Sequence, residues 1–168
     1  GAAVTQIHRW VEAANAGANP NVVARVRSGW VLAGAQQVVP GYCLLVPDPV
    51  VVDLNALAGA ARSQFLDDMA ALGDVLLQVT GAARINYEIL GNSERALHAH
   101  LFPRYESEPE ATRRAPVWLH DWERAPHFER NAQAGFIASV ATALEVRGRV
   151  MPSVAYSGAG RSSEEKRG

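Results

Sequence analysis

The sequence predicts an α+β fold built on a five-stranded antiparallel sheet. Two observations carry this prediction: β-rich runs follow one another between turn residues, and one long amphipathic helix separates the third run from the fourth. The 168 residues fit a single domain with a sizeable core. We expect that domain over residues 2–156, and a disordered tail of glycine, serine and charged residues over 157–168.

The N-terminal part of the chain predicts a peripheral helix and three strands. Residues 4–15 carry apolar side chains three or four positions apart, which is typical of a short amphipathic helix. Three β-rich runs then cover residues 22–26, 30–33 and 42–46, with glycine or proline between them. We expect these runs to form an antiparallel meander.

The clearest helix is predicted over residues 60–79, where apolar residues recur at steps of four and three. They form one stripe that should face the sheet. Two strands are expected after it, over 84–90 and 97–102, with a hairpin-like turn between them. A peripheral helix over 131–146 closes the domain. The residues of the stripe are Phe65, Met69, Leu72, Leu76 and Val79.

Composition excludes several classes of protein. A formal net charge of -1 argues against a protein that coats nucleic acid or a membrane surface. No apolar run approaches the roughly 20 residues that span a bilayer, and the first residues are too polar for a signal peptide, so we expect a cytoplasmic protein. The single cysteine, Cys43, allows no intrachain disulfide and no cysteine-based zinc framework. Small-molecule substrates fit this composition best.

The most informative feature is a pair of histidines, His98 and His100, in an apolar run. In a strand both side chains project from the same face. One imidazole can attack a phosphorus while the other donates to a phosphate oxygen, and the turn Gly91-Asn92-Ser93 can hold the remaining oxygens. The pair could instead hold a metal, which would need a third ligand. The candidates for that ligand are Glu88, His120 and His127.

These residues resemble the signature of the histidine triad (HIT) superfamily, His-φ-His-φ-His-φ-φ with φ apolar, often between Gly-Asn and Pro-Arg. His98 and His100 match its second and third histidines, and Ala96 stands at the first. Residues 39–47 are similar to the family's strand before its first long helix, so the resemblance covers about residues 22–105. The approach Leu90-Gly91-Asn92 resembles the bacterial diadenosine tetraphosphate hydrolase-like branch.

The resemblance implies a HIT-like fold and a hydrolase or transferase. Such proteins act at the α-phosphate of a nucleotide conjugate, a dinucleoside polyphosphate or a nucleoside phosphoramidate, through a nucleotidyl-histidine. It implies that His98 is the nucleophile and His100 its phosphate partner, with Asn86, Asn92 and Ser93 binding substrate. It also implies a homodimer and no obligatory cofactor or metal, although magnesium can accompany a polyphosphate substrate.

Two other functions stay open at this stage. The loss of the first histidine is also consistent with a non-catalytic nucleotide-binding protein, and the His-x-His pair with a metalloprotein. Beyond residue 105 two features have alternative interpretations. Arg113 and Arg114 either reach the distal phosphates of a polyphosphate or belong to a solvated loop. The aromatic segment over residues 117–128, with two tryptophans and two histidines, either packs as an amphipathic loop or a dimer edge, or covers the site as a lid.

Overall fold

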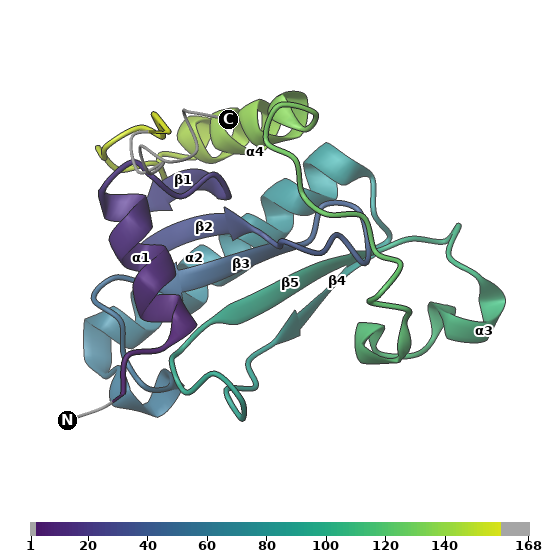
Figure 1. Cartoon of the computed structure of the whole chain (residues 1–168), viewed down its shortest axis with the longest axis horizontal. Helices are drawn as coiled ribbons and strands as arrows, with labels where there is room; N and C mark the ends of the chain where they lie inside the picture. Colours follow the sequence, from purple (N-terminus) through teal and green to yellow (C-terminus); the bar gives the residue numbers. More distant parts are fainter. Residues whose placement is uncertain (1–2, 159–168) are drawn as a thin grey trace, which may run out of the picture.

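The computed structural model describes residues 3–158 and contains one antiparallel sheet of five strands, in the order β1-β2-β3-β5-β4 (Figure 1). This confirms the predicted α+β fold and the meander of the first three strands. The strands are β1 (Val22–Val26), β2 (Gly29–Ala33), β3 (Cys43–Pro47), β4 (Arg84–Glu88) and β5 (Ala99–Arg104).

The helices lie close to their predicted positions. Thr5 begins the first one as a capping box, since its hydroxyl accepts from the backbone of His8 while its own N–H donates to the His8 ring. Three short elements add to the three long helices. The long helices are α1 (Gln6–Asn15), α2 (Gly59–Thr80) and α4 (Ala134–Val146). The short elements are α3 (Glu110–Arg113) and the 3-10 turns η1 (Leu54–Ala56) and η2 (Val117–Leu119), with a turn at Gly81 closing α2.

The helices cover opposite faces of the sheet. Because side chains alternate along a strand, β2 sends Val31 to one face and Trp30 and Leu32 to the other. The face of Val31 packs against α2 and α4, and the face of Trp30 packs against α1, which lies in front of the sheet in Figure 1. On the predicted α2 stripe, Phe65, Leu72 and Leu76 are buried, and Met69 and Val79 are partly buried against the same core.

The strand register places the second histidine on the α1 face. Leu32 pairs with Leu44, Leu44 pairs with His100, and His100 pairs on its other side with Glu88. Paired residues point to the same side of a sheet. His100 therefore shares its face with Leu32 and Leu44, on the side of the sheet away from α2.

The connection between β4 and β5 differs from the prediction. β4 ends at Glu88 and β5 begins at Ala99, so the two strands are joined by residues 89–98 and not by a tight turn. The N–H of Leu97 donates to the carbonyl of Val51, at 2.8 Å, and not to a strand. That bond delays the start of β5, and His98 precedes the strand by one residue.

Residues 105–128, which we call the arm, project from the end of the sheet and carry α3 and η2 (Figure 1). The arm was predicted as a loop. Its Val117 and Trp122 pack against Tyr42, Leu44 and Phe102 on the α1 face of the sheet. The arm is thus anchored beside the histidine pair.

The C-terminal end of the described chain returns to the N-terminal helix. The backbone N–H of Ser157 donates to the carbonyl of Gly17, at 2.9 Å. Most of the predicted disordered tail, residues 159–168, lies outside the described residues. Among the helices of residues 3–158, none has both the length and the apolar character needed to cross a membrane.

Candidate active site

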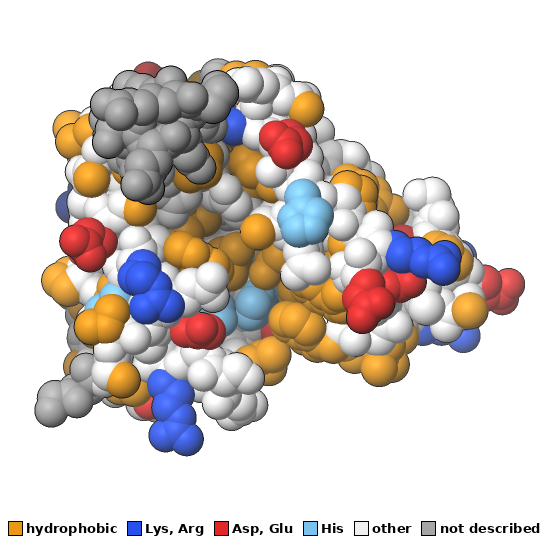
Figure 2. Space-filling view, in the orientation of Figure 1, with side chains coloured by type: hydrophobic (Ala, Val, Ile, Leu, Met, Phe, Trp, Pro, Cys, Tyr) orange, Lys and Arg blue, Asp and Glu red, His pale blue; other side chains and the backbone are white. Residues whose placement is uncertain are grey.

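His98 and His100 lie side by side on the α1 face of the sheet. Their ring centroids are 4.8 Å apart, and the ring planes meet at 72°. Each residue is 8% exposed. Figure 2 shows histidine side chains in a hollow of this face, between the body of the molecule and the arm. The extended backbone through Ala99 places both rings on the same side, where they can act on one bound group.

Each histidine ring has one nitrogen fixed by a hydrogen bond. Nδ1 of His98 lies 2.7 Å from the carbonyl oxygen of Ala96, and Nδ1 of His100 lies 2.6 Å from the hydroxyl of Tyr42. A carbonyl oxygen only accepts, so Nδ1 of His98 carries a proton and, in the neutral ring, Nε2 carries the lone pair. No described residue hydrogen-bonds that Nε2. His98 is thus prepared as a nucleophile.

Burial keeps His100 and Tyr42 neutral at physiological pH. Desolvation, and secondarily the nearby His98, lowers the pKa of His100 to about 4. Desolvation also raises the pKa of Tyr42 well above its ordinary value, with smaller contributions from Cys43 and Glu88. When the Tyr42 hydroxyl donates to Nδ1 of His100, Nε2 of that ring carries the proton and can donate to a phosphate oxygen.

Ala96 stands where the resemblance expects the first histidine. Its methyl group is buried with the α1 residues Ile7 and Val11, and its carbonyl oxygen holds His98. The hydrogen bond that orders His98 therefore comes from the backbone. A backbone carbonyl is present whatever side chain occupies position 96, so alanine does not disturb the tautomer of His98.

A cavity of about 340 Å³ opens in front of His98. Asn92 lines this cavity and Ser93 does not, although both belong to the same loop. Asp53 and Arg95 also line it, and neither was predicted as a site residue. The remaining lining residues are Val52, Ile89, Leu90, Gly91, Ala96 and Leu97.

The predicted site residue Asn86 lies apart from this cavity. It is on β4, and its amide oxygen accepts a hydrogen bond from Nη1 of Arg104 at 2.8 Å. The guanidinium of Arg104 also donates to the Glu108 carboxylate, 3.0 Å away. Burial alone would raise the pKa of Glu108, but hydrogen bonds from Arg104, the N–H of Tyr105 and His120 together lower it.

The arm forms an aromatic wall beside His100. The ring of Trp118 meets the His100 ring edge to face at 5.2 Å, and Nε1 of Trp118 donates to the Glu88 carboxylate. Trp122 stacks on Trp118 at 5.0 Å. Trp118 itself is 41% exposed. The tryptophans therefore pack against each other, and Trp118 also contacts His100.

Two further features bear on the chemistry of the site, the single cysteine and the candidate third metal ligands. Cys43 is completely buried, and burial raises the pKa of its thiol to about 12, so it is no nucleophile at neutral pH. Within residues 3–158, no three His, Cys, Asp or Glu side chains gather as metal ligands. Glu88 pairs with Trp118, and His120 pairs with Glu108 at 3.0 Å.

Comparisons with known proteins identify the fold. No protein-family description matches the chain, and no curated protein matches it. Among solved structures, a histidine triad protein from Marinobacter aquaeolei is similar with a TM-score of 0.67 and 23% identity, over 86% of this chain and 98% of that one. A histidine triad protein from Sinorhizobium meliloti gives 0.63 and 23%, over 73% and 88%.

A further similar structure is a hypothetical histidine triad nucleotide-binding protein from Sulfolobus tokodaii. Its TM-score is 0.59 and its identity 12%, over 75% of this chain and 84% of that one. All three neighbours match about three quarters or more of this chain in structure, at less than a quarter sequence identity. The chain has the fold of the histidine triad proteins.

Proposed function

We propose that this protein is a hydrolase or transferase acting at the α-phosphate of a nucleotide conjugate, with His98 as the nucleophile. The observation that carries the proposal is the hydrogen bond from Nδ1 of His98 to the Ala96 carbonyl. It leaves the lone pair on Nε2 of a histidine that lines a cavity. The name of the Sulfolobus tokodaii neighbour, a nucleotide-binding protein, supports a nucleotide as the ligand.

The proposed reaction has two steps. Nε2 of His98 attacks the α-phosphorus and forms a P–N bond, while the bond to the leaving group breaks and its electron pair departs with that group. His100 donates to a non-bridging oxygen and stabilises the charge that develops there. Water then attacks the phosphorus of the nucleotidyl-histidine, and the P–N bond breaks to release the nucleoside monophosphate and restore His98.

Other residues take supporting roles in this proposal. Asn92, which lines the cavity of His98, binds a phosphate oxygen, and Ser93 follows it in the same loop. Asn86 offers its amide N–H groups to substrate, because its oxygen already accepts from Arg104. A second cavity of about 320 Å³ lies between α1 and the sheet. Leu44, which pairs with His100 in the sheet, is one of its lining residues. Its largely apolar walls suit a nucleobase.

We place the protein near the diadenosine tetraphosphate hydrolase-like branch, with Ala96 in place of the first triad histidine. Support comes from the Leu90-Gly91-Asn92 approach and from the backbone carbonyl of Ala96, which orders His98 without a side chain. The rival candidate is a nucleotide-binding protein without catalysis. Ala96 is the observation that favours it, since a missing histidine is also what a degenerate site would show.

One experiment separates these two candidates. The protein is incubated with a diadenosine polyphosphate and with adenosine 5′-phosphoramidate, quenched in base, and examined for released AMP and for an adenylyl adduct by mass spectrometry. We expect turnover of at least one substrate and an adduct on His98. The His98→Ala variant should lose activity by at least about a thousandfold and form no adduct. His127→Ala, which changes an exposed histidine, is the matched control. Nucleotide binding without AMP or adduct would establish the rival.

A further inference from the structure

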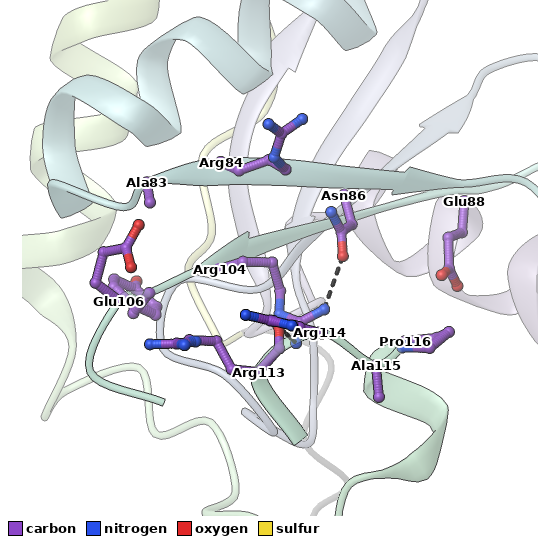
Figure 3. Close-up of a pocket in the computed structure, with 11 residues that line it drawn as sticks. Ala83, Arg84, Asn86, Glu88, Arg104, Glu106, Arg113, Arg114, Ala115 and Pro116 are labelled. Carbon is purple, nitrogen blue, oxygen red and sulfur yellow. Dashed lines mark hydrogen bonds between the residues drawn. The ribbon is translucent and has the colours of Figure 1, made fainter. Parts of the chain in front are cut away.

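A polar cavity that shares no lining residue with the cavity of His98 runs along β4. Its volume is about 500 Å³, and it lies between the sheet and the arm (Figure 3). Four of its eleven lining residues are arginines. The lining residues are Ala83, Arg84, Asn86, Glu88, Arg104, Tyr105, Glu106, Arg113, Arg114, Ala115 and Pro116.

The four arginines differ in how they are held. Arg104 is only 7% exposed, and its guanidinium is occupied by Glu108 and Asn86. The guanidinium groups of Arg84, Arg113 and Arg114 have no hydrogen bond or ion pair to any of the residues that the structure describes. Arg84 lines the cavity from β4, with its side chain pointing away from the other three in Figure 3, and Arg113 and Arg114 are the two uncompensated cations that the arm contributes.

Arg104 also fixes the position of these two cations. Its Nη2 donates to the backbone carbonyl of Arg113 at 3.2 Å and to that of Thr112 at 3.4 Å. The arm is thereby tied to β5 at the point where it presents Arg113 and Arg114. Two cations placed in advance lose less entropy on binding an anion than two on a free loop.

The inner end of the cavity adjoins the histidine pair. Glu88 lines the cavity, and in the β4–β5 register it lies directly opposite His100. The carboxylate of Glu88 accepts from Trp118, whose ring contacts His100. From Glu88 to Arg84 the strand rises about 13 Å, which is enough for a chain of several phosphates.

The two carboxylates of the cavity leave room for an anion between them. Glu88, at the inner end, is hydrogen-bonded to Trp118. Glu106 lies at the opposite end, beside Ala83 (Figure 3). Arg113, Arg114 and Arg104 occupy the stretch between these ends. An anion bound there would contact arginine side chains, which suit phosphate oxygens because their N–H groups form charge-assisted hydrogen bonds.

We propose that this cavity binds a phosphate chain, and that it receives the leaving group of the reaction at His98. The inference rests on the function proposed above. When the P–N bond to His98 forms, the bridging P–O bond breaks and its oxygen departs with the electron pair. The additional negative charge on the departing phosphate chain meets Arg113 and Arg114. An amine leaving group takes up a proton and has no such charge, so the cavity favours a polyphosphate over a phosphoramidate.

The kinetic test compares two substrates that share the adenylyl group, diadenosine tetraphosphate and adenosine 5′-phosphoramidate. In the double variant R113Q/R114Q, the ratio of their kcat/KM values should shift against the tetraphosphate by about ten- to a hundredfold. The control R27Q/R124Q removes two positive charges from exposed arginines outside the cavity and should keep the wild-type ratio. An unchanged ratio in R113Q/R114Q would overturn the inference and leave the proposed function standing.

A binding test decides the inference independently of turnover. Titration calorimetry with inorganic tripolyphosphate should give a site in the wild-type chain and in R27Q/R124Q, with affinity at least about tenfold weaker in R113Q/R114Q. Equal affinity in all three proteins, or no binding to the wild type, would contradict it. If the wild type turned over neither substrate, the proposed function would be refuted. The titration would still show whether the cavity binds a phosphate chain.

Discussion

The two histidines of the site differ in the group that hydrogen-bonds Nδ1 of each ring. The backbone carbonyl of Ala96 holds His98, and the hydroxyl of Tyr42 holds His100. The first partner is independent of the side chain at position 96. The second depends on one phenol, which burial keeps protonated at neutral pH. One main-chain group and one aromatic residue therefore order the two rings.

The low pKa of His100 makes the stability of the fold depend on pH. Above about pH 6.5 the imidazole is neutral in the folded and the unfolded chain. Between pH 6.5 and the folded pKa of about 4, only the unfolded chain takes up the proton, so the free energy of unfolding falls as the pH falls. We expect His100 to account for a loss of about 3 kcal/mol between pH 7 and pH 4.

Denaturant unfolding of the wild type and of the His100→Gln variant at pH 7, 5.5 and 4 measures this effect. The variant should lose about 3 kcal/mol less than the wild type over that range, whatever its stability at pH 7. His127→Gln removes an exposed histidine and serves as the control. Identical losses in the wild type and in His100→Gln would mean that His100 titrates normally in the folded chain.

At the scale of elements, the close approach of Gly34 to Tyr42 supports the site. A Cβ atom at residue 34 would lie 2.0 Å from Cδ1 and 2.1 Å from Cε1 of the Tyr42 ring. Tyr42 is 5% exposed and stacks on Phe102 at 4.3 Å, so the ring has little room to move away. Residue 34, directly after β2, must therefore be glycine if Tyr42 is to reach His100.

We expect Gly34→Ala to lower the free energy of unfolding by about 1–3 kcal/mol, through overpacking. Turnover should fall as well, because the displaced ring no longer holds His100. Tyr42→Phe, which removes only the hydroxyl, shows how much of the loss in turnover comes from the hydrogen bond. Gly135→Ala is the stability control, since nothing lies within 4 Å of its added Cβ. A Gly34→Ala protein as stable as the wild type would contradict this packing.

The strands show what a periodic pattern can and cannot predict. β1 was predicted with its observed bounds, because its valine-rich segment is directly flanked by turn residues on both sides. β5 begins two residues later than predicted, since the N–H of Leu97 bonds to Val51 and not to a neighbouring strand. The apolar pattern continues through Leu97, but hydrogen bonding decides where a strand begins. That bond joins segments far apart in the sequence.

At the scale of the whole molecule, Arg104 connects the sheet to the arm. Its guanidinium bonds Asn86 on β4, Glu108 at the base of the arm, and the carbonyls of Thr112 and Arg113. The side chains of Arg104 and Glu108 are only 9% and 8% exposed. Removing one partner of such a buried pair leaves the other charge without compensation.

We therefore expect Arg104→Gln to destabilise the fold by about 3–5 kcal/mol and to release the arm. Limited proteolysis should then cut within residues 105–128 faster than in the wild type. Adding Glu108→Gln to this variant should recover part of the stability, since no buried carboxylate stays unpaired. Arg124→Gln, at an exposed ion pair with Asp121 on the same arm, should behave as the wild type. Equal proteolysis of Arg104→Gln and the wild type would exclude this anchoring role.

The homodimer implied by the resemblance stays a prediction. In residues 3–158, β4 pairs with β5 on one side and with no strand on the other. An unpaired edge is the usual place for a sheet to continue into a second copy. Light scattering after gel filtration should give about twice the chain mass of 18.0 kDa. A mass of one chain at every concentration tested would contradict the prediction.

The sequence by itself determined the α+β class, the long helix, the strand order along the chain and the two-histidine run, because periodicity and turn residues are local properties. Only the tertiary structure decided what acts on those histidines. Tyr42 reaches His100 from 58 positions away, and Arg104 places Arg113 and Arg114 beside β4. Such partners depend on strand register and on how the arm packs. Both arise from contacts between distant residues, which no local pattern records.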